Sequence, residues 1–312
     1  MKLGFIGVGN LGLPICTNLM RKGHEVHAFD CDPAALARAA TAGAQPASST
    51  QDAVRGAEVV FTCLPGPDEV EAVAFGNGGV AQFGQPGLVF VDLTTNFPER
   101  AMRVAAALSA RGISMLEAPV GNGVVGAREG RSSVICGGDA KLFARIEPLL
   151  QCFATTIHHV GPIGNASIVK SIDILVAGVN LAVACEGFLL GARAGIDPDV
   201  LFDVISTNSG SSEQLKRRMK RKIIARDFSP EGSMTLALKD VRVTLELAAK
   251  TMTPMPYGSL LQQQFVAAIA KGWGPEDWAC VMKVFELATG TEVKRAGTAG
   301  RLSTADEASL TA

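Results

Sequence analysis

The chain has 312 residues, 47% of them hydrophobic and 19% charged, which provides enough apolar material for two folded domains and argues against disorder. Its 29 Lys and Arg nearly balance its 30 Asp and Glu, so we expect neither a nucleic acid nor a membrane surface as partner. The seven cysteines are odd in number and form no CxxC pair, which indicates reduced thiols rather than a disulfide framework or a zinc site. Because no signal peptide precedes the first apolar run, we expect a cytoplasmic protein.

Short apolar runs alternate with helical patterns through residues 1–162, a pattern typical of a parallel sheet wound by helices. Asp32 followed by Pro33 is a helix-start signal within this region. We therefore predict a Rossmann-type, doubly wound α/β domain, with strands at residues 2–7, 25–29, 59–64, 88–93, 114–118 and 133–136.

A GxGxxG motif lies between the first predicted strand and the helix that follows it. In it Gly7 would make the tight turn, Gly9 would let the backbone approach a pyrophosphate, and Gly12 would let helix and strand pack closely. The motif also contains Asn10 and Leu11, and its helix N-terminus offers free N–H groups to phosphates. These five residues are the predicted binding loop for a dinucleotide.

Asp30 stands at the end of the second predicted strand. A carboxylate there accepts hydrogen bonds from the ribose 2′-hydroxyl of NAD and repels the 2′-phosphate of NADP. No Arg follows to offset that repulsion, since the next residues are Cys31 and Asp32. We predict NAD as cofactor; the alternative is that Asp30 only caps the turn.

Two further strand ends are predicted to line the same crevice at the carboxyl edge of the sheet. They are Leu64-Pro65 after the third predicted strand and Thr94-Thr95 after the fourth. Their alternative interpretation is as ordinary strand-to-helix turns.

A glycine-rich loop follows the next predicted strand and contains Gly121, Asn122 and Gly123. Such a loop can bring backbone N–H groups close to an anionic ligand; the alternative is a flexible connector. His158 and His159 stand at a later strand end without Cys or carboxylates at ligand spacing, so no metal site is predicted.

From residue 163 the pattern changes to helices, and we predict an all-helical second domain over residues 163–290 with a flexible tail over residues 291–312. Its first helix should span about residues 165–194 and end at Gly195. That helix is apolar enough to resemble a membrane span, but it contains Asp173, Asn180 and Glu186, so we interpret it as a buried helix, with Glu186 as a buried packing partner. The basic run at residues 214–222 is interpreted as a solvated helix face.

Lys170 lies near the start of this apolar helix, and its charge is costly there unless it is used or partnered. Helical spacing places Lys170, Asp173 and Asn180 on one face. A buried lysine can act as general acid or base at a carbonyl or hydroxyl oxygen. The alternative is a structural ion pair between Lys170 and Asp173. Lys239, followed by Asp240, is by itself only a charged residue in a helical stretch.

Five motifs in order make the chain resemble the β-hydroxyacid dehydrogenase family: GFIGVGNLGLPICTNLMRKGHEV, VDLTTNFPE, EAPVGNGVVGAREG, GPIGNASIVK and LALKD. The resemblance covers about residues 1–290. It implies that Lys170 is the general acid/base and that Thr95 and Lys239 approach the nicotinamide half of the cofactor. It also implies that the loop of Gly121, Asn122 and Gly123 grips the carboxylate end of the substrate.

Two departures from the family pattern affect the substrate. Members usually carry Ser where this chain has Gly121, and the amide of Asn122 is a candidate replacement for the missing hydroxyl. Members usually carry Asn at the position of Asp173, and often another at that of Ile174. An ionised Asp173 would oppose a substrate carboxylate but would hold Lys170 charged, so either the substrate differs from simple acids or Asp173 pairs with Lys170.

The sequence therefore predicts an NAD-dependent dehydrogenase of a small 3-hydroxy acid, with Lys170 as general acid/base and Asp173 in the substrate site. One alternative is a reductase of an imine or semialdehyde in which Asp173 assists proton donation. Another is a non-catalytic NAD-binding module, against which the presence of Lys170 argues. Because the long apolar helix exceeds what one small domain buries, we also expect a homodimer or homotetramer.

Overall fold

The computed structural model describes residues 1–295, which form two compact units, Met1–Ser171 and the residues from Ile172 onward. The break falls inside the long helix α9 (Asn165–Arg193), whereas the sequence analysis placed it at residues 162 and 163, just before that helix. Each unit has its own hydrophobic core.

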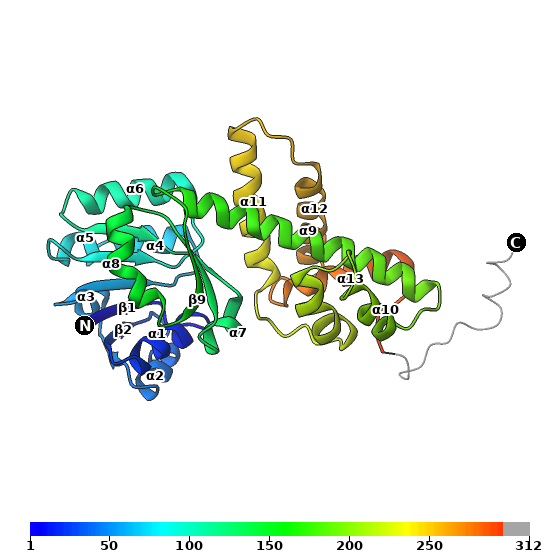
Figure 1. The fold of residues 1–312 in the computed structure, drawn as a ribbon, viewed down its shortest axis with the longest axis horizontal. Coiled ribbons are helices and arrows are strands. Elements are labelled where there is room, and N and C mark those ends of the chain that lie inside the picture. Colours follow the sequence, from blue (N-terminus) through cyan, green and yellow to red (C-terminus); the bar gives the residue numbers. More distant parts are fainter. Residues whose placement is uncertain (296–312) are drawn as a thin grey trace, which may run out of the picture. The chain divides into compact units, whose positions relative to one another are not determined.

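The first unit is coloured blue to green in Figure 1. It is built on a six-stranded parallel sheet of order β3-β2-β1-β4-β5-β6. Its strands are β1 (Lys2–Ile6), β2 (Glu25–Phe29), β3 (Gln45–Pro46), β4 (Val59–Thr62), β5 (Val89–Asp92) and β6 (Ser114–Glu117). The strand order reverses between β1 and β4, and such a switch point forms a ligand crevice at the carboxyl ends of the strands. The predicted Rossmann-type α/β fold is confirmed, and within this six-stranded sheet only the two-residue strand β3 was not predicted.

Helices pack on both faces of this sheet, and its central strands β4 and β5 are therefore buried on both sides. On one face Phe5 stacks on Phe61 with ring centroids 5.9 Å apart, and Phe153 meets Phe61 edge-on. On the other face Val60 and Phe90 belong to a separate cluster. The helices are α1 (Gly12–Arg21), α2 (Pro33–Thr41), α3 (Thr50–Val54), α4 (Pro67–Phe75), α5 (Val80–Phe83), α6 (Pro98–Ser109) and α8 (Ala140–Leu150).

A second, three-stranded sheet completes the first unit. It consists of β7 (Val120–Gly121), β8 (Ser132–Cys136) and β9 (Ala154–His159), with α7 (Gly123–Arg128) between β7 and β8. β7 is antiparallel to β8, and β9 is parallel to it. The strand predicted at residues 133–136 therefore exists but belongs to this sheet, where it pairs with Val120 and Gly121 at the start of the glycine-rich loop.

The second unit is helical, and no strand occurs between residue 165 and residue 295. After α9 its elements are α10 (Pro198–Ile205), the π-helix η1 (Leu215–Ile224), α11 (Met234–Lys250), α12 (Pro256–Ala270), the 3₁₀ turn η2 (Trp278–Cys280) and α13 (Val281–Thr289). The basic run lies in η1, but its interpretation as a solvated face is wrong at two positions. Arg218 is buried against Asp277 and Trp278, and Lys222 is buried against Asp227 and Ser229.

The helix α9 ends as predicted, with Gly195 in the left-handed region at a φ of 81°. It is long and apolar enough to cross a membrane by length and composition, yet only 39% of its most apolar window is buried within the described chain. The interpretation as a buried helix is therefore wrong for one face, which exposes Val176, Val183 and Leu190. Glu186 is exposed as well.

The flexible tail was predicted to begin at residue 291, which is too early. Val293 is buried in the helical core, and its N–H donates to Glu286 Oε1 at 2.8 Å. Glu286 also accepts from Arg226 Nη1 at 2.6 Å. Residues 291–295 are thus held in place, and the rest of the predicted tail lies outside the described residues.

Candidate active site

The turn between β1 and α1 has the geometry that the GxGxxG motif predicts. Gly7 has a φ of +92°, and a Cβ on it would lie 2.3 Å from the carbonyl oxygen of Cys63. A Cβ on Gly12 would lie 2.0 Å from the carbonyl oxygen of Gly7, whereas one on Gly9 would meet nothing within 4 Å. Gly7 and Gly12 are therefore required by the fold itself, while Gly9 leaves open space at the turn. Asn10 and Leu11 complete this turn before α1 begins.

Asp30 follows β2 beside this turn, and backbone donors fix its carboxylate. Its Oδ2 accepts from the N–H of Val8 at 2.8 Å, and its Oδ1 accepts from the N–H of Asp32 at 2.9 Å. The turn-capping role that the sequence analysis gave as an alternative is thus present. Each oxygen retains a second lone pair for a ligand hydroxyl.

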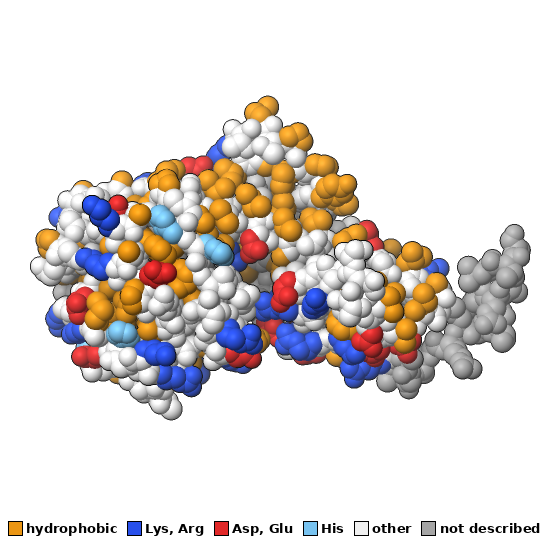
Figure 2. All heavy atoms as spheres, in the orientation of Figure 1, with side chains coloured by type: hydrophobic (Ala, Val, Ile, Leu, Met, Phe, Trp, Pro, Cys, Tyr) orange, Lys and Arg blue, Asp and Glu red, His pale blue; other side chains and the backbone are white. Residues whose placement is uncertain are grey.

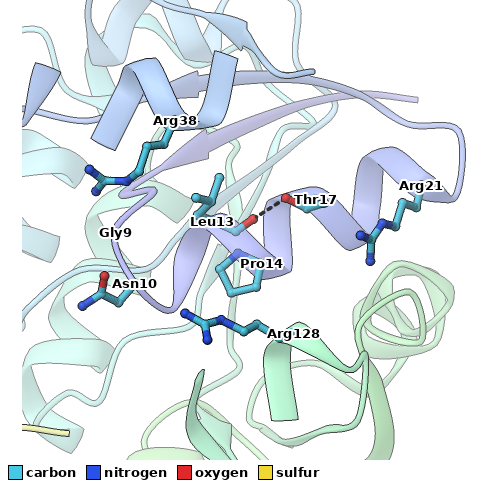
Figure 3. Close-up of a pocket in the computed structure, with 8 residues that line it drawn as sticks. All are labelled: Gly9, Asn10, Leu13, Pro14, Thr17, Arg21, Arg38 and Arg128. Atoms are coloured by element: carbon cyan, nitrogen blue, oxygen red, sulfur yellow. Dashed lines mark hydrogen bonds between the residues drawn. The ribbon is translucent and has the colours of Figure 1, made fainter. Parts of the chain in front are cut away.

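A cavity of about 450 Å³ opens along α1 beside the glycine turn. Arg38 from α2 and Arg128 from α7 approach Gly9 and Asn10 in it, while Arg21 lies at the far end of α1 (Figure 3). The complete lining is Gly9, Asn10, Leu13, Pro14, Thr17, Arg21, Arg38 and Arg128. Guanidinium groups next to a helix N-terminus favour an anionic ligand. Sequence reasoning missed Arg38 and Arg128 because their approach depends on the packing of three helices.

The predicted strand ends Leu64-Pro65 and Thr94-Thr95 are joined to each other. The N–H of Leu64 donates to Thr94 Oγ1 at 3.1 Å, and the N–H of Thr94 donates to Asp92 Oδ1 at 3.0 Å. Burial raises the pKa of the Asp92 carboxyl, and the hydrogen bonds from Thr94 and Thr62 oppose that rise. This network fixes the turn in which Thr95 lies half-buried at the carboxyl edge of the sheet.

The glycine-rich loop is tied by a side-chain hydrogen bond to the segment that follows α7. Asn122 has a φ of 67° and leads directly into α7, which starts at Gly123. Its side-chain amide donates to the carbonyl oxygen of Arg131 at 3.1 Å, so this N–H group holds the loop. Gly121 pairs with Ser133 of β8, and a Cβ on Gly121 would lie 3.3 Å from the Cβ of Ser133. The absence of a side chain at Gly121 thus suits the close pairing of these strands.

Lys170 lies in the second turn of α9 and is only 8% exposed. Asp173 follows it on the same helix and is exposed, and Asn180 is half-buried. Lys239 lies on α11 in the helical unit, where its Nζ is 3.1 Å from Asp240 Oδ1. Within residues 1–295 no group of three His, Cys, Asp or Glu side chains could hold a metal ion.

Glu117 is a further buried carboxylate that the sequence analysis did not single out. It ends β6 next to Asp92 of β5, its partner in the parallel register, and is 1% exposed. Burial raises its pKa, while hydrogen bonds from Ser167 and Gly164 act against that rise. The only feature of the sequence that could have marked Glu117 as a candidate is its position at a strand end, just before a glycine-rich loop.

Two family models together match most of the chain. Residues 2–161 match the NAD binding domain of 6-phosphogluconate dehydrogenase, and residues 164–285 match the NAD-binding domain of NADP-dependent 3-hydroxyisobutyrate dehydrogenase. The chain is 33% identical to a 2-(hydroxymethyl)glutarate dehydrogenase of Eubacterium barkeri over 94% of its own length and 97% of the relative's. It is 34% identical to a 3-hydroxyisobutyrate dehydrogenase of Pseudomonas aeruginosa over 84% and 90% of the two lengths.

A solved structure agrees with these matches. The crystal structure of a 3-hydroxyisobutyrate dehydrogenase from Salmonella typhimurium superposes with a TM-score of 0.84 at 31% identity, covering 91% of this chain and all of that one. The glycine turn, the two-unit architecture and matches over nearly the whole length all lead to one assignment: the chain belongs to the β-hydroxyacid dehydrogenase family of NAD(P)-dependent oxidoreductases that act on CH–OH groups.

Proposed function

We propose that this protein is an NAD-dependent dehydrogenase of a small 3-hydroxy acid and that Lys170 is its general acid/base. The observation that carries the proposal is the burial of Lys170 near the start of α9. Burial of an amine costs free energy unless its charge is partnered or the amine takes part in chemistry. When bound, the cofactor supplies the hydride acceptor at its nicotinamide ring. In oxidation Lys170 accepts the hydroxyl proton of the substrate, and in reduction it returns that proton to the carbonyl oxygen.

The proposed cofactor site consists of the glycine turn, Asp30, the strand ends Leu64-Pro65 and Thr95, and Lys239. The fixed carboxylate of Asp30 supports NAD, because its oxygens can accept from a ribose 2′-hydroxyl and would repel a 2′-phosphate. Arg38 in the neighbouring cavity is the feature that favours NADP. Steady-state kcat/KM with NAD⁺ and NADP⁺ decides between them. A preference for NADP⁺ in the wild type, unchanged in Asp30→Ser, would contradict the assignment.

For the substrate we propose the loop of Gly121, Asn122 and Gly123, together with Lys170 and Asp173. The left-handed backbone at Asn122 and Gly123 supports this role, because such a conformation can turn successive N–H groups toward an anion. A carboxylate at Asp173 disfavours a second negative charge nearby. Two alternative functions remain. An imine or semialdehyde reductase would use Asp173 in proton donation, and a non-catalytic NAD-binding module would bind the cofactor without turnover.

The test is NAD⁺ reduction across a panel of small hydroxy acids with the wild type, Lys170→Ala and Asp173→Asn. We expect oxidation of at least one acid, its loss in Lys170→Ala, and retained or improved turnover in Asp173→Asn. Glu129→Gln, at an exposed position of the same unit, serves as the control substitution. Loss of turnover in Asp173→Asn with activity retained in Lys170→Ala would instead favour the imine or semialdehyde chemistry.

We further propose that copies of this chain assemble into a homodimer or homotetramer in the cytoplasm, without nucleic acid or membrane partners. The support is the exposed apolar face of α9, and the same helical unit also exposes Val200 and Val204 of α10. Figure 2 shows hydrophobic side chains gathered over the helical unit. A second copy is favoured over lipid because Asp173 and Glu186 lie exposed on the same helix, and charges are costly within a membrane.

A further inference from the structure

The first turn of α9 is held by a carboxylate that comes from a distant strand. Glu117 Oε2 accepts from the N–H of Gly164, and Glu117 Oε1 accepts from the hydroxyl of Ser167. These donors are 47 and 50 residues away from Glu117 in the sequence. Both belong to the segment that begins α9, three residues or more before Lys170.

This arrangement replaces a local helix cap. The first N–H groups of a helix have no partner within it, and the residue just before the helix usually supplies one through its side chain. Here that residue is Gly164, which has no side chain and a φ of +100°. The carboxylate of Glu117 takes the place of the cap, and its negative charge suits the positive end of the helix.

The backbone of Glu117 is itself fixed. Its N–H and its C=O both pair with Gly137 at 2.9 Å. Gly137 lies directly under α9, since a Cβ on it would be 3.1 Å from the Cβ of Ala166. The end of β6, Gly137 and the first turn of α9 therefore form one closely packed group, all within the first compact unit.

We infer that Glu117 is a positioning residue for Lys170, a role that rests on the proposed function of that lysine. Ser167, whose hydroxyl Glu117 accepts, precedes Lys170 by three residues, so it lies about 4.5 Å away along the helix axis. Because the first turn of α9 is fixed, the Cα of Lys170 is fixed in its position along the helix axis and in its rotation about that axis. Glu117 is too deeply buried to exchange a proton with a substrate, and it acts through the helix. A misplacement of about 1 Å at a reacting group can cost a hundredfold in rate.

The experiment compares Glu117→Gln with Asp139→Asn in the full-length protein. Asp139 is a matched control because its carboxylate caps a different helix of the same unit, α8, by accepting from the N–H of Leu142 at 2.9 Å. Two readouts are taken. One is kcat per NADH-binding site, with its pH profile, on whichever panel acid is oxidised. The other is the rate at which trace acetic anhydride labels Lys170, relative to exposed Lys271, measured by mass spectrometry without substrate.

We expect Glu117→Gln to lower kcat by about tenfold to a hundredfold, to shift the pH profile and to raise the labelling rate of Lys170 severalfold. NADH binding should remain, and Asp139→Asn should change neither readout, although it loses a cap. Ser167→Ala removes one of the two hydrogen bonds and should show smaller changes in the same direction. It also provides the test if Glu117→Gln does not fold.

The inference is overturned if folded Glu117→Gln, or Ser167→Ala in its place, keeps the labelling rate of Lys170 and the pH profile of the wild type. It is also overturned if Asp139→Asn changes both readouts equally. Failure of the proposed function gives a different result, because Lys170→Ala would then retain turnover. If no acid on the panel is oxidised, the labelling rate alone decides.

Discussion

Replacing Gly12 with Ala should damage both the fold and cofactor binding, and the structure gives the reason. The added Cβ would lie 2.0 Å from the carbonyl oxygen of Gly7 and 3.2 Å from Phe5 Cε1. Normal contact requires more than 3 Å, so the start of α1 must move away from β1 by about 1 Å. Overpacking against backbone typically costs about 1–3 kcal/mol, and we expect about 3 kcal/mol here, which lowers Tm by roughly 6–12 °C in a domain of this size.

The matched control is Gly9→Ala, because a Cβ on Gly9 meets no atom within 4 Å. It should leave Tm within about 1 °C and still weaken NADH binding, since it blocks the approach of the pyrophosphate. Scanning calorimetry measures the first effect and NADH fluorescence titration the second. Equal Tm values for Gly12→Ala and the wild type, or tight NADH binding in Gly9→Ala, would refute this account of the glycine turn.

Three further predictions concern stability and assembly. The hydrogen bond from Arg100 lowers the pKa of Glu71 to about 2. The ionised Glu71 therefore stabilises the folded state above the unfolded pKa of about 4.3, and this contribution is lost as pH falls toward 2. Glu71→Gln should cost about 1 kcal/mol at pH 7 and nothing near pH 2, and a constant cost in calorimetry at both pH values would contradict this. Asp277→Ala leaves the buried guanidinium of Arg218 without its carboxylate and should cost about 3–5 kcal/mol in urea unfolding; a cost below about 1 kcal/mol would show that the pair is not needed. Leu190→Glu, at a position 71% exposed on α9, should yield monomers in light scattering; an assembly of unchanged mass would exclude this face as the interface.

The fold of the first unit could be predicted because its signals are local. Strands such as β4 and β5 are buried on both faces and therefore appear as short, continuous apolar runs. Gly7 and Gly12 could be placed because each satisfies a steric requirement set by neighbouring backbone. β3 could not be predicted, since two residues, one of them Pro46, carry no periodic pattern.

The rest of the site depends on contacts between segments far apart in the sequence. Glu117 caps α9 across about fifty residues, and the basic run looks solvated until Arg218 meets Asp277, which lies 59 residues away. Arg38 and Arg128 line one cavity from two different helices. Hydrophobic periodicity within a short window of residues does not predict contacts between segments that are distant in the sequence. The composition of α9 likewise predicted burial, because hydropathy does not distinguish a core from a surface that another molecule could cover.

The short edge strand β3 has a consequence for how the protein behaves at high concentration. It pairs with β2 at only two positions, and Pro46 at one of them has no N–H to offer. At the opposite edge, the end of β6 is already bridged to Gly137. An incoming strand from another chain would find few donors and acceptors along β3 and would meet an occupied position at Glu117 of β6, so edge-to-edge polymerisation is disfavoured. Overexpression and refolding should therefore proceed without sheet-mediated aggregation of the native first unit.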